Sequence, residues 1–152
     1  MEPTAAEAVV VDPLVWVFFY GSYINVDVLK EVGLVPESME VAKLSGFDIR
    51  IAPRANLVRS ARDCVYGVLA TANHRELARL YTHAQEVLGE TYLPEAVLVE
   101  AANGTWRPAM TYLCPSMEPR PAERAYVERI LEPARKFSFP TWYIERIERF
   151  LR

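Results

Sequence analysis

The stretch Leu14-Val15-Trp16-Val17-Phe18-Phe19-Tyr20-Gly21-Ser22-Tyr23 decides the fold. Its first seven residues are β-branched, aromatic or leucine, which predicts a strand that is buried on both faces. Gly21 closes this strand, and turn and capping residues follow as far as Asn25. A short helical pattern begins after Asn25 and ends near Gly33. We therefore expect a buried strand, a tight glycine turn and a helix in immediate succession.

Two further strands are predicted in the middle of the chain. Leu44 to Ile51 alternates between apolar and polar residues, as a half-buried strand does, and Pro53 closes it. Cys64 to Ala70 is apolar throughout and predicts another buried strand. The polar residues from Arg54 to Asp63 predict a long loop between these two strands.

The second half of the chain carries helix signals. Asn73 with Glu76 three residues later resembles a capping box, and an apolar helical face follows. Pro121 is typical of a helix start, and Pro133 predicts a kink or an end of the same helix. A last helix is expected from about Thr141.

A hairpin completes the expected sheet. Tyr92 to Ala101 and Thr105 to Leu113 are strand-like and flank Asn103-Gly104, which is the strongest short hairpin signal. Pro108 predicts an edge or a bulge in the second strand. Strands and helices are intermixed without a βαβ repeat, so we predict an α+β fold: a small mixed β-barrel with short flanking helices.

Composition favours a single domain over residues 1–152, with residues 1–12 as a loose N-terminal arm. The chain has 152 residues, 51% of them hydrophobic, and a formal net charge of −3, which argues against nucleic acid as a partner. Two cysteines and two histidines do not suit a zinc site. No apolar run is long enough to span a membrane, and no basic leader precedes one. We expect a cytoplasmic protein that binds neither membrane nor metal.

The turn from Tyr20 to Tyr23 is the first candidate site. Backbone N–H groups between a strand end and a helix start can hold a carboxylate or an oxyanion. Gly21 permits a ligand to approach closely, and the hydroxyl of Ser22 adds a donor. The alternative is an ordinary strand-to-helix turn with Ser22 and Asn25 as caps, and spacing alone favours that alternative.

Family motifs change this balance. Phe18 to Asn25, Phe-Phe-Tyr-Gly-Ser-Tyr-Ile-Asn, resembles the opening Tyr-Gly-Ser motif of the γ-glutamylcyclotransferase-like superfamily, which includes the AIG2-like proteins. Further similar segments follow in order: Ala42 to Phe47, Ala55 to Leu69, Tyr92, Thr111-Tyr112 and Pro140 to Ile147. The resemblance spans about residues 15–150, and its specificity lies in the ordered set.

This resemblance implies a cofactor-independent transferase or lyase that acts on a small-molecule γ-glutamyl amide. The α-amine of the substrate attacks its own γ-carbonyl, and 5-oxoproline and an amine or amino acid are released. Such an enzyme has to hold the chain folded, move a proton and stabilise the oxyanion. The resemblance also implies that Tyr20, Gly21, Ser22 and Tyr23 bind the glutamyl part. The oligomeric state stays open between monomer and homodimer.

The catalytic glutamate that the resemblance implies has no clear match. Counting forward from the preceding helix gives Ala84, whereas counting back from Tyr92 gives Gln85 or Glu86. We favour Glu86 as the acid and base, because a local bulge in the helix would restore its register. Gln85 can contribute a hydrogen bond but cannot exchange a proton at neutral pH. His83 and Glu95 are the other candidates for proton transfer, although a lone histidine at a helix end is more often a cap or a surface residue, and a solvent-facing Glu95 would have no special role.

Several side chains complete the expected site. Tyr112 and Tyr143 match positions at which the family has a tyrosine, and their hydroxyls could bond a substrate. Arg54 could pair with a substrate carboxylate, although a solvated loop arginine is commoner. Trp142 is expected in the core. The altered motif around Ala84 keeps an alternative open, namely a binding protein or a different acyl or amine-transfer chemistry on the same scaffold.

Overall fold

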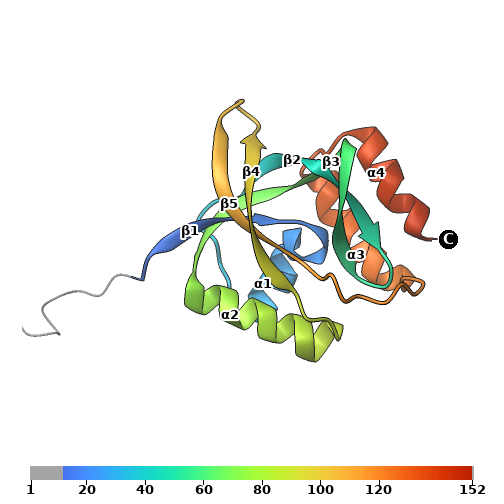
Figure 1. The fold of residues 1–152 in the computed structure, drawn as a ribbon, viewed down its shortest axis with the longest axis horizontal. Coiled ribbons are helices and arrows are strands. Elements are labelled where there is room, and N and C mark those ends of the chain that lie inside the picture. Colours follow the sequence, from blue (N-terminus) through green and yellow to red (C-terminus); the bar gives the residue numbers. More distant parts are fainter. Residues whose placement is uncertain (1–11, 152) are drawn as a thin grey trace, which may run out of the picture.

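Five strands form one sheet that closes on itself in the order β1-β3-β2-β4-β5 (Figure 1). The computed structural model describes residues 12–151. The strands are β1 (Leu14–Phe19), β2 (Glu40–Ile51), β3 (Ala55–Asn73), β4 (Leu93–Ala101) and β5 (Trp106–Leu113). Neighbouring strands are antiparallel except β1 and β5, which close the ring in parallel at Val17 and Met110. The predicted α+β barrel is confirmed.

The loop expected from Arg54 to Asp63 is wrong. β3 already begins at Ala55 and pairs with β2 from Ile51 back to Phe47, so the two strands form a long hairpin. The polar residues in this part of β3 are mostly exposed because the hairpin extends beyond the core. Polarity alone does not distinguish an exposed strand from a loop, which explains the error.

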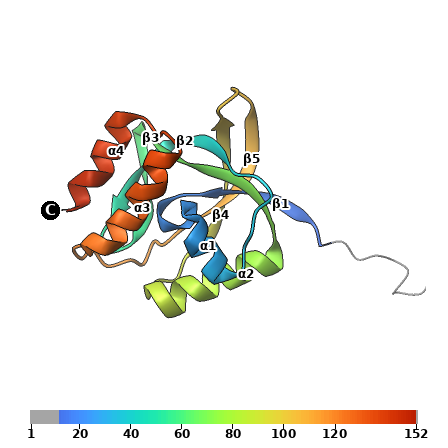
Figure 2. The same cartoon turned by 180° about the vertical axis from the view of Figure 1, so that it is seen from behind.

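Helices cover the outside of the sheet (Figure 2). They are η1 (Gly21–Ile24, a 3-10 helix), α1 (Val26–Val32), α2 (His74–His83), η2 (Ala84–Leu88, a π-helix), α3 (Arg124–Lys136), α4 (Thr141–Glu148) and η3 (Arg149–Leu151). The Asn25 side chain accepts from the N–H of Asp27 at 3.0 Å and caps α1. Asn73 and Glu76 form the predicted capping box of α2. Within residues 12–151, no helix combines the length and apolar character needed to cross a membrane.

Pro133 was expected to kink α3 or to end it. The helix does not end there but continues to Lys136. A proline has no N–H, so Pro133 leaves the carbonyl of Arg129 without its usual helical donor. The Asn25 Nδ2 atom donates to this carbonyl at 3.0 Å. The same side chain therefore caps α1 and satisfies α3, which fixes these two helices relative to each other.

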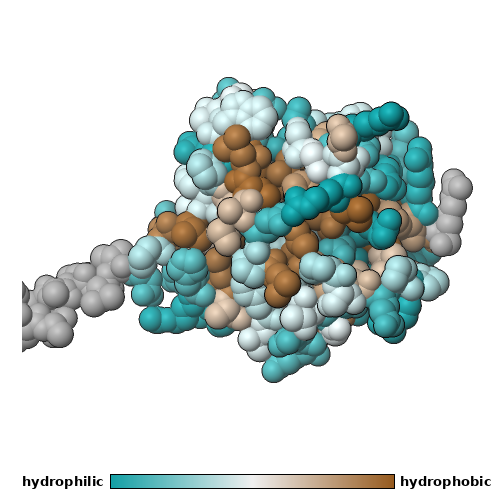
Figure 3. Space-filling view, in the orientation of Figure 1, coloured by the Kyte–Doolittle hydropathy of each residue, from teal (hydrophilic) through white to brown (hydrophobic). Residues whose placement is uncertain are grey.

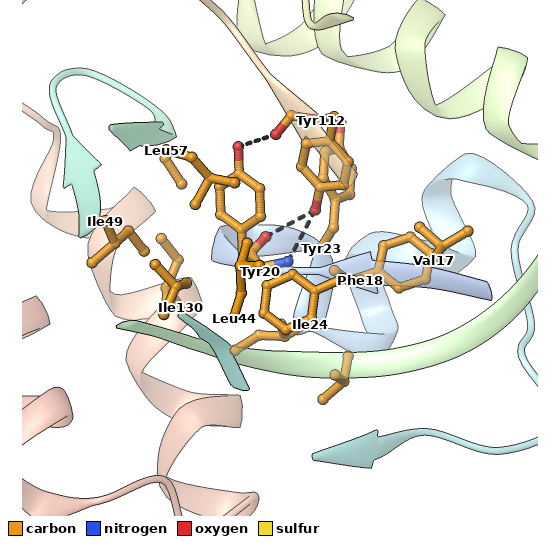
Figure 4. Packing of buried hydrophobic residues seen from close by; sticks show 14 of the residues in the cluster. Val17, Phe18, Tyr20, Tyr23, Ile24, Leu44, Ile49, Leu57, Tyr112 and Ile130 are labelled. Carbon is orange, nitrogen blue, oxygen red and sulfur yellow. Dashed lines mark hydrogen bonds between the residues drawn. The ribbon is translucent and has the colours of Figure 1, made fainter. Parts of the chain in front are cut away.

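The core fills the closed sheet and the space beneath the helices (Figure 4). Gly67 has no room for a side chain, because a Cβ atom there would lie 2.2 Å from the carbonyl oxygen of Phe19. Trp142 was expected in this core, but it is 52% exposed. It lies at the rim of the aromatic group around Tyr66. The N-terminal arm expected for residues 1–12 lies outside the described residues apart from Asp12.

Candidate functional site

Four buried tyrosines, which we call the tyrosine cluster, lie beside the turn after β1: Tyr20, Tyr23, Tyr92 and Tyr112. The hydroxyl of Tyr112 accepts from the N–H of Tyr20 and donates to its carbonyl, both at 3.1 Å. The hydroxyl of Tyr20 in turn donates to the carbonyl of Tyr112 at 2.6 Å, and the two rings stack (Figure 4). These mutual bonds use the O–H donor of each phenol within the protein.

Burial is the largest cause that raises the pKa of each tyrosine in the cluster, and neighbouring phenols add to it, while the hydrogen bond from the N–H of Tyr20 opposes the rise at Tyr112. The four side chains are therefore neutral at physiological pH. Tyr92 donates its hydroxyl to the carbonyl of Ala55, so this phenol is also occupied by the protein's own backbone. The sequence predicted Tyr20 and Tyr112 as substrate-binding residues. In the structure their buried side chains instead join the end of β1 to β5.

The turn itself is tightly packed on one side. Gly21 has a φ of +64°, and a Cβ atom there would lie 2.4 Å from the Cβ of Ala55. Both features require glycine. Gly21 and Ser22 open the 3-10 helix η1, so their N–H groups have no acceptor inside that helix.

The turn also borders a cavity of about 180 Å³, which we call the serine-histidine cavity. Its lining comes from η1, α1, the end of α2 with η2, the start of α3 and the turn between β2 and β3. The lining residues are Ser22, Val28, Arg54, His83, Val87, Leu88, Glu123, Ala125, Tyr126 and Arg129. Ser22 is 3% exposed, and its Oγ atom makes no hydrogen bond with good geometry within the described residues.

His83 links this cavity to the tyrosine cluster. Its Nδ1 atom lies 3.0 Å from the hydroxyl of Tyr23, in a hydrogen bond whose direction depends on the tautomer. Its Nε2 atom lies 3.5 Å from a carboxylate oxygen of Glu31, near enough for charge attraction but without hydrogen-bond geometry. The imidazole is therefore oriented on one nitrogen and unsatisfied on the other, an arrangement that suits proton exchange.

Tyr126 is another buried residue of the cavity lining, and the Arg54 side chain packs against it. The Arg54 guanidinium lies over the Tyr126 ring, 4.8 Å from its centroid, and the Arg54 Nε atom donates to the carbonyl of Leu88 at 3.2 Å. The hydroxyl of Tyr126 holds the N–H of Ala55 at 2.9 Å. Burial raises the pKa of Tyr126, and the backbone of Ala55, the nearby Ser22 hydroxyl, Arg54 and Arg129 oppose this rise in that order.

The structure does not bring Glu86 into the cavity. The expected bulge exists, because residues 84–88 form the π-helix η2, but Glu86 is exposed on it. Ala84 occupies the buried position of this turn and is 0% exposed. The neighbouring Gln85 is exposed and donates to the hydroxyl of Thr91 at 3.1 Å. The residue that faces inward from η2 is therefore an alanine, which carries no titratable group.

The other predicted groups lie elsewhere. Glu95 pairs with Arg59 at 2.7 Å near the outer part of the β2–β3 hairpin. Tyr143, which is a residue of α4, packs against Tyr66, Phe139 and Trp142 and does not line the cavity. Of the residues predicted to act on a substrate, the structure brings together Ser22 and His83, with Arg54 beside them.

Tyr126 and Arg129 were missed by the sequence reasoning. Both lie on α3, more than 100 residues along the chain from Ser22, and no local motif marks them. Their spacing of three residues places them on one helical face, which is a weak signal by itself.

Solved structures show which class of fold this is. The fold is that of the γ-glutamyl cyclotransferases and AIG2-like proteins, as the motifs predicted. A structure named gamma-glutamyl cyclotransferase superposes with a TM-score of 0.71 at 23% identity, over 90% of this chain and 87% of its own. An uncharacterized human protein gives 0.75 at 22% identity, over 89% and 86%. An AIG2-like protein from Mus musculus gives 0.56 at 18% identity, over 70% and 80%. No protein-family model and no curated protein matches the sequence.

Proposed function

We propose that this protein cleaves a γ-glutamyl amide by intramolecular attack of the α-amine, and that His83 moves the proton in place of a glutamate. The observation that carries the proposal is that one cavity is lined both by His83, whose Nε2 is buried without a hydrogen bond, and by Ser22, whose buried Oγ makes no hydrogen bond of good geometry. A fold shared with γ-glutamyl cyclotransferases supports the reaction class. Fold alone does not determine a reaction, so this reaction is inferred from the side chains that line the cavity.

The cavity offers complementary groups for a glutamyl headgroup. Ser22 Oγ can donate to the α-carboxylate, and Arg54 supplies positive charge in the same lining, whereas the Arg129 guanidinium is paired with Glu31 at 3.0 Å. The N–H groups at the start of η1 can stabilise the oxyanion that forms on the γ-carbonyl. The volume of about 180 Å³ suits a small headgroup rather than a whole peptide.

The proton path follows from the contacts of His83. When Nδ1–H donates to the hydroxyl of Tyr23, Nε2 carries a lone pair and accepts a proton from the attacking α-amine. The amine nitrogen bonds to the γ-carbon, and the imidazolium is stabilised by Glu31. The imidazolium then protonates the leaving nitrogen, the γ-amide bond breaks, and 5-oxoproline and a free amine leave. One proton enters His83 and one leaves it, so the enzyme is regenerated.

A second candidate function is binding of the same class of ligand without turnover. The buried Ala84 and the exposed Glu86 favour it, because the described part of the chain presents no carboxylate on the inward face of η2. This candidate uses the same cavity and differs in the role of His83.

Release of 5-oxoproline from a panel of γ-glutamyl amides tests the proposal. We expect turnover by the unmodified protein and a loss of about 10²-fold or more in His83→Gln, which keeps a hydrogen-bonding side chain but cannot exchange a proton. Glu86→Gln is the matched control, and its rate should be unchanged because Glu86 is exposed on η2.

The outcomes separate the two functions. Ligand binding without any 5-oxoproline would favour the binding protein and refute catalysis. Turnover that survives His83→Gln but is lost in Glu86→Gln would refute the role of His83 and restore the carboxylate predicted from the sequence.

A further inference from the structure

We propose that a second cavity next to the serine-histidine cavity binds the leaving part of the substrate, and that Arg120 there selects a leaving part that carries a carboxylate. This inference rests on the proposed function for the orientation of the substrate. It assigns to this chain a specificity-determining residue, Arg120, outside the groups that act on the glutamyl part.

The second cavity has a volume of about 380 Å³ and is lined by Pro53, Arg54, Leu88, Arg120, Pro121 and Glu123. Three of these residues, Arg54, Leu88 and Glu123, also line the serine-histidine cavity. The two cavities therefore adjoin along a shared wall. We infer that a ligand whose headgroup occupies the first cavity reaches the second alongside the Arg54 side chain, which forms part of this shared wall.

Arg54 stands at this boundary as a fixed positive charge. Its Nε atom is held by the carbonyl of Leu88 and its face by the ring of Tyr126. Within residues 12–151, neither Arg54 nor Arg120 has a carboxylate within 4.0 Å. A half-buried guanidinium without a counter-charge favours an anionic ligand.

Arg120 is placed by its backbone. It lies between Pro119 and Pro121, whose rings restrict the chain, and its N–H donates to the carbonyl of Ala52 at 3.4 Å. The side chain is exposed, so no neighbour has to move before it contacts a ligand. Two arginines and one glutamate line the cavity, which gives it a net positive charge.

The consequence is a preference among leaving amines. An amine with a carboxylate, such as an amino acid, gains a charge-assisted hydrogen bond to Arg120. A neutral alkylamine gains none, and a diamine is repelled by the two guanidinium groups. The cavity is larger than the first, which suits a leaving part with a side chain.

Binding of two glutaryl amides tests the subsite independently of catalysis. Glutarylglycine and glutarylethylamide have nearly the same size, differ in the terminal carboxylate, and lack the α-amine, so neither can cyclise. By calorimetry we expect the protein to bind glutarylglycine about tenfold more tightly than glutarylethylamide. Arg120→Gln should abolish this preference. Arg124→Gln is the matched control, because Arg124 is exposed on α3, lines neither cavity and pairs with Glu128.

Each result decides the question. Equal affinity for both ligands in the unmodified protein, no binding of either, or a preference that survives Arg120→Gln would overturn the subsite. A preference that disappears in Arg120→Gln and persists in Arg124→Gln would establish it. If that preference holds while γ-glutamylglycine gives no 5-oxoproline, the proposed catalysis fails and the subsite stands.

Discussion

The tyrosine cluster and the serine-histidine cavity both include residues of the turn after β1, but they differ in whether their buried polar groups are hydrogen-bonded. In the cluster, the hydroxyls of Tyr20, Tyr92 and Tyr112 are all bonded to backbone groups of the protein. In the cavity, Ser22 Oγ and His83 Nε2 are buried without a hydrogen bond. Buried polar groups are normally satisfied, so unsatisfied ones beside a cavity indicate where a ligand binds. The family motif runs through both regions and does not separate them.

The largest effect should be the response of the tyrosine cluster to alkali. Burial raises the pKa of Tyr20, Tyr92 and Tyr112 far above the usual value, so these groups stay protonated in the folded protein while the unfolded chain ionises above about pH 10. Their stabilising contribution is complete below that pH and is lost as the pH rises, on the order of 4 kcal/mol per pH unit for three groups. Urea unfolding between about pH 8 and about pH 11 measures it.

A pH titration of the folded protein, followed by phenolate absorbance, checks this prediction. If all eight tyrosines of the folded protein ionised near pH 10, the cluster would not be desolvated as described.

The turn that divides the two regions should be almost as sensitive. Gly21→Ala places a Cβ 2.4 Å from the Cβ of Ala55 at a positive φ, and we expect it to lower the free energy of unfolding by about 3 kcal/mol or more. Gly104→Ala is the control, since its φ is +84° but no atom lies within 4 Å of the added Cβ. It should cost about 1–2 kcal/mol. Equal losses in the two variants would contradict the tight packing at Gly21.

A pair of hydroxyl deletions sharpens the comparison directly. Tyr112→Phe leaves the buried N–H of Tyr20 without an acceptor and should cost about 1–3 kcal/mol of stability, with ligand affinity retained. Ser22→Ala removes a hydroxyl that lies near the Tyr126 hydroxyl without a hydrogen bond of good geometry, so stability should change by less than about 1 kcal/mol while ligand affinity falls. Urea unfolding and calorimetry on both variants give the four values. If Tyr112→Phe lowered ligand affinity and Ser22→Ala lowered stability, the tyrosine cluster would be the binding site and the cavity would serve packing.

The smallest effect concerns Asn25, which holds α1 and α3 beside the cavity. Asn25→Asp keeps the acceptor that caps α1 but removes the donor to the carbonyl of Arg129. We expect a loss of about 1 kcal/mol for Asn25→Asp and about 2 kcal/mol for Asn25→Ala. In a Pro133→Ala background, the helix supplies its own donor to Arg129, so the cost of Asn25→Asp should shrink. An unchanged cost there would show that the Asn25–Arg129 bond does not compensate for the proline.

Local signals predicted much of the fold, and for physical reasons. Three features depend only on residues close together in the chain and were therefore predicted from the sequence: the apolar strand that starts at Leu14, the capping box at Asn73 and the hairpin at Asn103-Gly104. The outer hairpin of β3 was missed because its exposed residues are as polar as a loop. Trp142 was misplaced because aromatic character does not tell a core position from a rim.

The candidate site was predictable only in part. Ser22 and His83 carry chemistry that can be read from the sequence, whereas their meeting with Tyr126 and Arg129 depends on how α3 packs against η1. The expected bulge at Glu86 was correct as backbone geometry, yet the π-turn directs Ala84 inward. Register within one turn of helix is set by packing, which a single sequence does not show.

A crystal structure of the protein with glutarylglycine bound tests the central claim most directly. We predict that the α-carboxylate equivalent lies within hydrogen-bond distance of Ser22 Oγ, with the glycine carboxylate next to Arg120. A ligand seated among the tyrosines of the cluster, or anywhere that leaves Ser22 Oγ without a partner, would contradict it.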